Sequence, residues 1–268
     1  MNSSRNDLLS IKEFSRLTSI KQSTLRYYDG LGLFCPAKRG ENGYRYYTPQ
    51  QTTTINSISL LHELGMPIRQ LSEIQANRSP ELMLGILTDK EESLEAELIH
   101  IERSYNVVRT FKRMIQIGLT ANEKNIEVRF FEEMPIVVGP VNDFDDSDAF
   151  YHAFYTFCSL AKQYRIDLRL PVGGMFQDFD TFVNVPSKPT NFFSVDPKGL
   201  DSRPAGMYVS AFNRGYYGET GDLLERIENY IRDNGLKPVG PVYNIFLHNE
   251  LSIDDPANYL LHATVRVA

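Results

Sequence analysis

Positively charged and aromatic side chains alternate in a short stretch near the start of the chain, between residues 21 and 47. Guanidinium groups donate hydrogen bonds to phosphate oxygens, which gives nucleic-acid binding its salt-dependent affinity. The side chains that we expect to contact phosphate and sugar are Arg26, Tyr27, Arg39, Tyr44, Arg45 and Tyr46. Polar residues at the start of a recognition helix usually face the base edges. The candidates for base reading are therefore Lys21, Gln22, Ser23 and Thr24.

A purely structural role is the alternative for some of these aromatic side chains. Each of four tyrosines could fill the core of a small domain instead of contacting DNA: Tyr27, Tyr28, Tyr46 and Tyr47. Tyr28 shares a helical face with Leu25 and Leu31, so it is the strongest candidate for the core.

Residues 121–268 combine many aromatic side chains with negative charge. They hold a formal charge of −8, whereas residues 1–75 hold +3 and residues 76–120 hold −1. Aromatic faces and carboxylates both favour positive charge, so this part suits a lipophilic cation. Most of its aromatic side chains must fill a core, yet some can line a cavity. The candidates for ligand contact are Tyr151, Phe154, Tyr155, Phe176, Asp178, Tyr217, Tyr243 and Tyr259.

Other chemistries have little support. The histidines are scattered, and no Ser-His-Asp order, metal-ligand spacing or phosphate-binding glycine loop occurs. Cys35 and Cys158 lie far apart in sequence, which argues against a disulfide and a thiolate metal site. We therefore expect no catalytic residue, metal or cofactor. Because the sequence lacks an apolar run of about 20 residues and a signal-peptide core, we expect a cytoplasmic protein that does not enter a membrane.

The elements that position the basic side chains follow from apolar spacing. Two short helical runs with a polar break between them predict a helix-turn-helix; their apolar residues are Ile11, Phe14 and Leu17, then Leu25, Tyr28 and Leu31. Ser10 with Glu13 and, separately, Ser23 are the expected caps. Turn formers at residues 39–43 and a strand at 44–47 predict a hairpin wing. A further helix pair is expected to begin at Thr48-Pro49 and at Pro67, with Gly65 between them.

Residues 80–119 form the most regular stretch of the chain. An apolar residue recurs every seven positions, at Leu87, Leu94, Ile101, Val108 and Ile115. A run of about five heptads without proline predicts a long coiled-coil helix. Its apolar seam needs a partner, so we expect a symmetric homodimer and a palindromic DNA element. The expected division is a winged helix-turn-helix domain at 1–78, a dimerisation helix at 79–120 and an α+β domain at 121–268.

The α+β domain is predicted to consist of two strand-helix-strand-strand units. The first has two strands around Pro135, a helix at 147–164 and a strand pair at 171–179 and 181–186. The second has a strand at 205–215, a helix at 221–235 and strands at 238–249 and 259–267. Similar Pro-Val-Gly triplets begin at Pro171 and Pro238, at matching places. This pattern indicates an internal duplication that creates a groove between the two units.

Three segments together resemble the signature of a known family. They read LRYYDGLGLFCP at residues 25–36, GYRYYT at 43–48 and LLHELGMPIRQLSEI at 60–74. These segments, in this order, resemble MerR-family transcription regulators over roughly the first 120 residues. The following part is similar, less closely, to the GyrI-like effector domain of BmrR-type multidrug-responsive members.

The resemblance implies additional contacts and partners. It implies that the second helix pair packs under the wing and brings His62 and Arg69 to the DNA backbone, and that the long helices pair antiparallel. It also implies an activator that binds a drug-like ligand and distorts a promoter spacer for RNA polymerase.

One position departs from the family pattern. Where the family usually carries an acidic residue after a Val-Tyr pair, this sequence has Asn244, which remains a candidate for ligand contact. An amide offers no counter-charge. Three explanations stay open: another carboxylate such as Asp178, Asp180 or Glu219 replaces the acid, aromatic contact alone recognises the cation, or the ligand is neutral.

Two functions of other classes also stay open. Some GyrI-like domains hydrolyse small molecules, which requires a carboxylate beside a tyrosine in the groove. Alternatively, the chain is a constitutive architectural DNA binder whose C-terminal domain only docks proteins.

Overall fold

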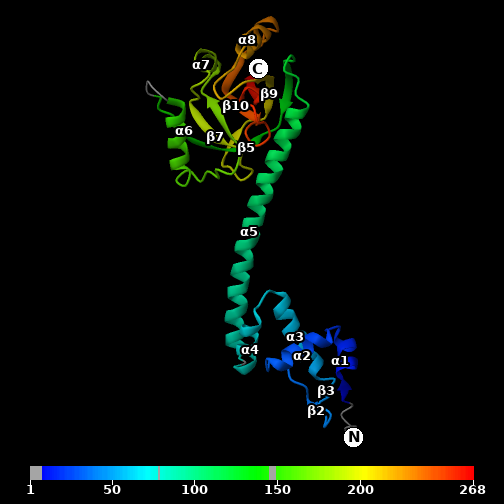
Figure 1. Cartoon of the computed structure of the whole chain (residues 1–268). Helices are drawn as coiled ribbons and strands as arrows, with labels where there is room; N and C mark the ends of the chain where they lie inside the picture. The colour runs from blue at the N-terminus through cyan, green and yellow to red at the C-terminus, as the bar shows by residue number, and fades with distance from the viewer. Residues whose placement is uncertain (1–7, 78, 145–148) are drawn as a thin grey trace. The chain divides into compact units, whose positions relative to one another are not determined.

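The computed structural model describes residues 8–77, 79–144 and 149–268. These residues form two compact units, and the division lies between Glu97 and Leu98, within the long helix α5 (Pro80–Leu119). The expected domain limit at residue 78 and the expected helix start at residue 147 lie outside the described residues. Figure 1 shows the elements of both units.

The N-terminal unit is the expected winged helix-turn-helix. Helices α1 (Ile11–Thr18) and α2 (Gln22–Gly30) are joined by a turn in which Ser19 adopts a φ of 60°. Strands β2 (Lys38–Arg39) and β3 (Arg45–Tyr47) form the wing hairpin, and β1 (Leu9–Ser10) pairs with β3 as a third strand that we did not predict. Helices α3 (Gln51–Glu63) and α4 (Ile68–Ala76) follow.

Stacked aromatic rings hold this unit together. The ring of Tyr47, from the wing, lies 4.6 Å from that of Phe14 and 5.7 Å from that of Phe34. Leu25 and Tyr28 are buried beside them, as predicted from their spacing. The wing is therefore fixed to the helix pair through the core.

Helix ends and faces differ from expectation in several places. Ser10 and Glu13 form the predicted capping box. Ser23, however, lies inside α2, because the helix already begins at Gln22. Leu17 and Leu31 are exposed, since they lie at the ends of their helices, beyond the buried face. The third helix begins at Gln51 instead of Pro49, and the Thr48 N–H donates to the Gln51 side chain.

Helix α5 runs unbroken over 40 residues, as predicted. Four of the five seam residues are exposed on the single chain, namely Leu87, Leu94, Ile101 and Val108. The long helix is confirmed, and the homodimer that would cover this seam remains a prediction. None of the described helices is long and apolar enough to cross a membrane.

The C-terminal unit is built on one antiparallel sheet with the strand order β4-β9-β11-β10-β6-β7-β5-β8. The strands are β4 (Glu127–Phe131), β5 (Met134–Val141), β6 (Val172–Phe176), β7 (Asn191–Ser194), β8 (Asp201–Arg203), β9 (Gly206–Arg214), β10 (Pro238–His248) and β11 (Leu260–Val267). The helices are α6 (Ala149–Leu160), α7 (Phe179–Asn184) and α8 (Leu223–Asp233), with a short 3-10 turn at Pro256–Asn258.

The strand order shows the predicted duplication. Apart from the short helix α7 between β6 and β7 and the 3-10 turn between β10 and β11, the elements β5-α6-β6-β7 and β9-α8-β10-β11 follow the same sequence of types. In the sheet, the order β5-β7-β6 of the first unit matches β9-β11-β10 of the second. Strands β6 and β10 therefore pair at the centre of the sheet.

Short links force the sheet to curl. Only residues 132–133 join β4 to β5, and only residues 204–205 join β8 to β9, although β4 and β8 are the two edge strands. Cα atoms three positions apart span at most about 11 Å. The edges must approach each other, so the sheet closes into a half-barrel.

The first duplicated unit corrects two predictions. Residues 181–186 were expected to form a strand beside β6, but residues 179–184 form α7, capped by the Asp178 carboxylate, and β7 is the partner of β6. Phe179 and Phe182 are three residues apart, a helical spacing. The break between the first two strands falls at residues 132–133, and Pro135 lies inside β5.

A buried histidine makes the C-terminal unit sensitive to acid. Burial, followed by the charges of Arg203 and Arg129, lowers the pKa of His262 to about 3, and its Nε2 lies 2.9 Å from the Ser210 hydroxyl. Above about pH 6.5, His262 is neutral in both the folded and unfolded states. Below that pH the unfolded chain takes up a proton that the folded unit excludes, so folding stability is lost as the pH falls towards 3.

We expect this residue to contribute a slope of about 1.4 kcal/mol per pH unit to the free energy of unfolding between pH 6 and 4. Urea unfolding at several pH values, compared between wild type and His262→Gln, measures this contribution. Glutamine retains a polar partner for Ser210 and cannot titrate. Equal slopes in the two proteins would show that His262 is not the group responsible.

Candidate functional site

Most side chains that we expected to meet DNA are accessible on the N-terminal unit. Tyr27 is 54% exposed and Tyr44 is 62% exposed, so the structural alternative is wrong for Tyr27. It is correct for Tyr28 and Tyr47, which are buried. The other exposed candidates are Lys21, Ser23, Arg26, Arg39, His62 and Arg69, whereas Gln22, Thr24, Arg45 and Tyr46 are half-buried.

A buried carboxylate ties the wing to the recognition helix. Asp29, near the end of α2, accepts hydrogen bonds from Arg39 at 2.6 Å and from Arg45 at 2.5 Å. The Asp29 side chain is only 1% exposed, while that of Arg39 remains 55% exposed. Both arginines therefore position the wing, and Arg39 keeps part of its guanidinium free for a phosphate. The sequence did not suggest this role for Asp29.

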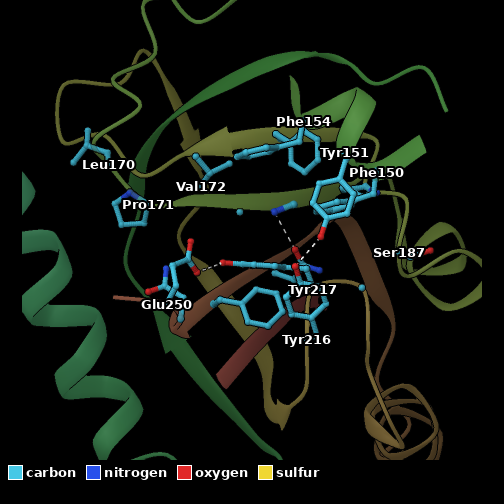
Figure 2. Close-up of a pocket in the computed structure, with 18 of the residues that line it drawn as sticks. Phe150, Tyr151, Phe154, Leu170, Pro171, Val172, Ser187, Tyr216, Tyr217 and Glu250 are labelled. Carbon is cyan, nitrogen blue, oxygen red and sulfur yellow. Dashed lines mark hydrogen bonds between the residues drawn. The ribbon is translucent and has the colours of Figure 1, made fainter. Parts of the chain in front are cut away.

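A cavity of about 470 Å³ lies in the C-terminal unit. Figure 2 shows α6 on one side of it and the segment with Tyr216 and Tyr217 on another. Its aromatic lining comprises Phe111, Phe150, Tyr151, Phe154, Phe192, Tyr216, Tyr217 and Phe246. Phe111 belongs to α5, so the long helix supplies part of the wall. A space of this size and character suits a drug-sized lipophilic molecule.

Two hydrogen bonds order the tyrosines of this cavity. The Tyr217 hydroxyl donates to the Glu250 carboxylate at 2.6 Å, and the hydroxyls of Tyr151 and Tyr216 lie 2.7 Å apart (Figure 2). Burial and then the bond to Glu250 raise the pKa of Tyr217, which therefore stays protonated as the donor. Glu250 keeps its second carboxylate oxygen for another partner.

Glu250 is the single carboxylate among the described residues that line the cavity. Arg169 also lines it, but this cation is held by Asp167, with nitrogen–oxygen distances of 2.6 Å and 2.9 Å. The uncompensated charge at the cavity is therefore negative.

Asn244 lines the cavity and also has a structural role. Its Oδ1 accepts the Gly174 N–H at 2.9 Å, which links the two central strands. A Cβ at Gly174 would lie 2.5 Å from that Oδ1, so the close approach requires glycine. Asn244 presents an amide to the cavity and no charge.

The structure brings only part of the expected ligand set together. Tyr151, Phe154, Tyr217 and Asn244 line the cavity. The other five candidates do not: Tyr155 points to solvent and is 71% exposed, Phe176 is buried 4.9 Å from Phe182, Asp178 caps α7, Tyr243 packs on Phe193, and Tyr259 is buried behind Tyr217. Alternation along β10 explains Tyr243, because it points to the opposite face from Asn244.

The charge at the cavity is also not where we expected it. Asp178, Asp180 and Glu219 were the proposed substitutes for the missing acid, yet none lines the cavity. Glu219 instead accepts the Tyr216 N–H at 2.9 Å. Glu250 follows the end of β10 by two residues, and no local pattern distinguishes it from other exposed acids. The position of Glu250 at the cavity can be recognised only from the three-dimensional structure.

Comparisons with known proteins agree with this architecture. Residues 9–77 match the model of the MerR HTH family regulatory proteins. The chain is 26% identical to the multidrug-efflux transporter 2 regulator of Bacillus subtilis over 92% of this chain and 91% of that protein. It is 24% identical to the multidrug-efflux transporter 1 regulator of the same organism, over 97% and 98% of the two chains.

The winged helix-turn-helix, the long helix and the separate cavity-bearing unit define a transcription regulator with an effector-type domain. The chain belongs to the MerR family and is related to regulators of multidrug-efflux transporters. Among solved structures, the C-terminal domain of EcmrR matches with a TM-score of 0.41 and 12% identity, over 54% of this chain and 97% of that chain.

Proposed function

We propose that this chain is a dimeric, ligand-responsive transcription activator whose C-terminal cavity binds a lipophilic cation. The observation that carries the proposal is the Glu250 carboxylate within an aromatic cavity, held at 2.6 Å by Tyr217. Its relatives that regulate multidrug-efflux transporters support the same class of function.

The cavity chemistry favours a cation over a neutral or anionic guest. Aromatic faces attract positive charge, and a carboxylate among them provides the counter-charge. Tyr217 donates to one oxygen of the Glu250 carboxylate, and the other oxygen remains for the ligand. Contacts from Phe150, Phe154 and Phe246 would bury the apolar body of the ligand.

The N-terminal unit is proposed to bind one half of a palindromic promoter element. Its candidates for base reading lie at the start of α2, and Arg26, Tyr27 and Tyr44 are exposed for phosphate contact. Two copies joined through the exposed seam of α5 would match the two half-sites. RNA polymerase is the proposed partner at the promoter, and the proposed location of the regulator is the cytoplasm.

Ligand binding is proposed to shift the dimer between two geometries, one of which distorts the promoter spacer. Phe111 lines the cavity and belongs to α5, so a ligand can favour one position of the long helix. Deforming a short duplex costs on the order of 1–6 kcal/mol. A difference of a few kcal/mol in ligand affinity between the geometries is sufficient.

In vitro transcription from the promoter upstream of the chain's own gene tests this proposal. A cationic dye should raise the transcript level about tenfold, which needs a coupling free energy of about 1.4 kcal/mol. A zwitterionic dye of the same size is the matched control and should act weakly. If a panel of lipophilic cations leaves transcription unchanged, the architectural DNA binder becomes the better description.

The Tyr217–Glu250 pair also favours a second candidate function, small-molecule hydrolysis. A carboxylate beside a protonated tyrosine can activate water while the tyrosine donates to the leaving oxygen. Incubating the purified protein with activated esters, and following product by chromatography, tests this alternative. Turnover that Glu250→Gln abolishes would establish hydrolysis, whereas a bound but unchanged compound would leave the sensor as the function.

A further inference from the structure

A cluster of arginines lies on the other face of the curled sheet. Register partners in antiparallel strands point to the same face. Arg129, Tyr208 and Arg266 are direct partners across β4, β9 and β11, and thus form one row. The same register places Tyr243 on this face and Asn244 on the opposite one. The arginine face is therefore separate from the aromatic cavity.

Arg203 is the buried member of this cluster. It ends β8, at the corner where the half-barrel closes, and is only 8% exposed. Its guanidinium carbon lies 4.6 Å from the ring centroid of Phe131 and 5.2 Å from that of Tyr208. Its Nε is buried and makes no hydrogen bond within the described residues. The rings attract the cation, but they do not neutralise its charge and do not form a strong hydrogen bond with this N–H.

Further arginines lie on the same face of the sheet as Arg203. Arg266 lies at the same corner, where it donates to the Ala205 carbonyl at 3.3 Å and packs against Gly206. The guanidinium carbon of Arg129 lies 5.4 Å from the Phe131 ring centroid. Burial lowers the pKa of Arg203, the phenol groups of Tyr208 and Tyr243 act in the opposite direction, and the charge of Arg113 from α5 again lowers it.

Acidic partners are sparse around this cluster. Arg129 reaches Glu127 at 3.4 Å. In the part of the chain that the structure describes, no carboxylate oxygen lies within 4.0 Å of a guanidinium nitrogen of Arg203, Arg266 or Arg113. Burying a cation without a counter-charge is unfavourable, and like charges nearby increase the cost. A bound anion would remove both penalties.

We propose that Arg203, Arg266 and Arg113 form a binding site for a small anion of the phosphate or carboxylate class. Arginine donates two parallel hydrogen bonds to such groups. Tyr243 shares the face and is close enough to Arg203 and Arg266 to respond to their charge. Burial raises the pKa of Tyr243 to about 12, against the lowering effect of these two charges, so its hydroxyl remains a donor. The site lies beside α5, and an anion here would hold α5 to the sheet.

Titration of the full-length protein with inorganic phosphate tests the site. At constant ionic strength, phosphate should raise the unfolding temperature of the C-terminal unit, whereas chloride should not. Succinate in a parallel arm distinguishes a preference for carboxylates. The site is absent if neither anion stabilises the protein more than chloride does.

Three variants locate the effect. Arg203→Met keeps much of the apolar volume, removes the buried charge and should weaken phosphate binding about tenfold or more. Arg113→Gln should weaken phosphate binding about threefold. Arg113 is an exposed residue of α5, so a loss of binding in this variant cannot be attributed to misfolding. Arg232→Gln, on exposed α8, is the control and should bind as wild type does. Undiminished binding in both Arg203→Met and Arg113→Gln would overturn the proposal.

The anion site and the cation cavity can be tested independently. Glu250→Gln alters the opposite face and should leave phosphate binding unchanged. Loss of phosphate binding in this variant would contradict the assignment to the arginine face. Failure of the cationic dye to bind would count against the proposed function and not against this site.

Discussion

Replacing Glu250 with glutamine should weaken the binding of a lipophilic monocation about tenfold, or about 1.4 kcal/mol. Glutamine can still accept from Tyr217, so the tyrosine keeps its partner while the counter-charge is lost. The effect is limited to this size because Glu250 is exposed to solvent, where screening weakens charge–charge interactions. Quenching of tyrosine fluorescence by a cationic dye measures the affinity.

Two companion variants make this result specific. Asn244→Glu adds a carboxylate to the cavity lining, whose oxygen can still accept the Gly174 N–H, and should tighten cation binding. Glu225→Gln removes an exposed charge on α8 and should have no effect. Unchanged cation affinity in Glu250→Gln would show that this carboxylate is not the counter-charge.

The second large effect is expected at Asp29. Asp29→Ala should lower the free energy of unfolding of the N-terminal unit by about 3 kcal/mol, because it leaves two guanidinium groups without their shared buried partner. The wing also loses its link to α2, so affinity for promoter DNA should fall at every salt concentration. Urea unfolding and DNA-binding titrations of the same preparation measure the two effects.

Glu41→Gln provides the control for this prediction. Glu41 is an exposed acid in the wing turn, and removing its charge should leave stability nearly unchanged. If Asp29→Ala keeps both wild-type stability and wild-type DNA affinity, the ion pairs do not position the wing.

Periodic features of the fold could be predicted from the sequence. The heptads from Leu87 to Ile115 predicted α5, and the spacing of Leu25 and Tyr28 predicted the buried face of α2. These predictions succeeded because the residues recur at the period of the element that contains them. Strand β1 was missed because its two residues are too short a segment for any period.

The candidate site was less predictable because it depends on long-range pairing. Tyr243 and Asn244 are adjacent in sequence, yet only Asn244 reaches the cavity, since strand neighbours face opposite ways. Glu250 meets Tyr217 across 33 positions of sequence. Aromatic content indicated a cavity, but it could not separate Phe176, which is buried in the core, from Phe154, which lines the cavity.

The central claim is that the cavity recognises a lipophilic cation through aromatic contact and one carboxylate. Calorimetric titration of the full-length protein with a cationic dye and with its uncharged analogue of the same shape tests this claim most directly. We predict that the cation binds at least about tenfold more tightly, with the difference largely removed in Glu250→Gln. Equal affinity for the two compounds, or binding of neither, would contradict the account.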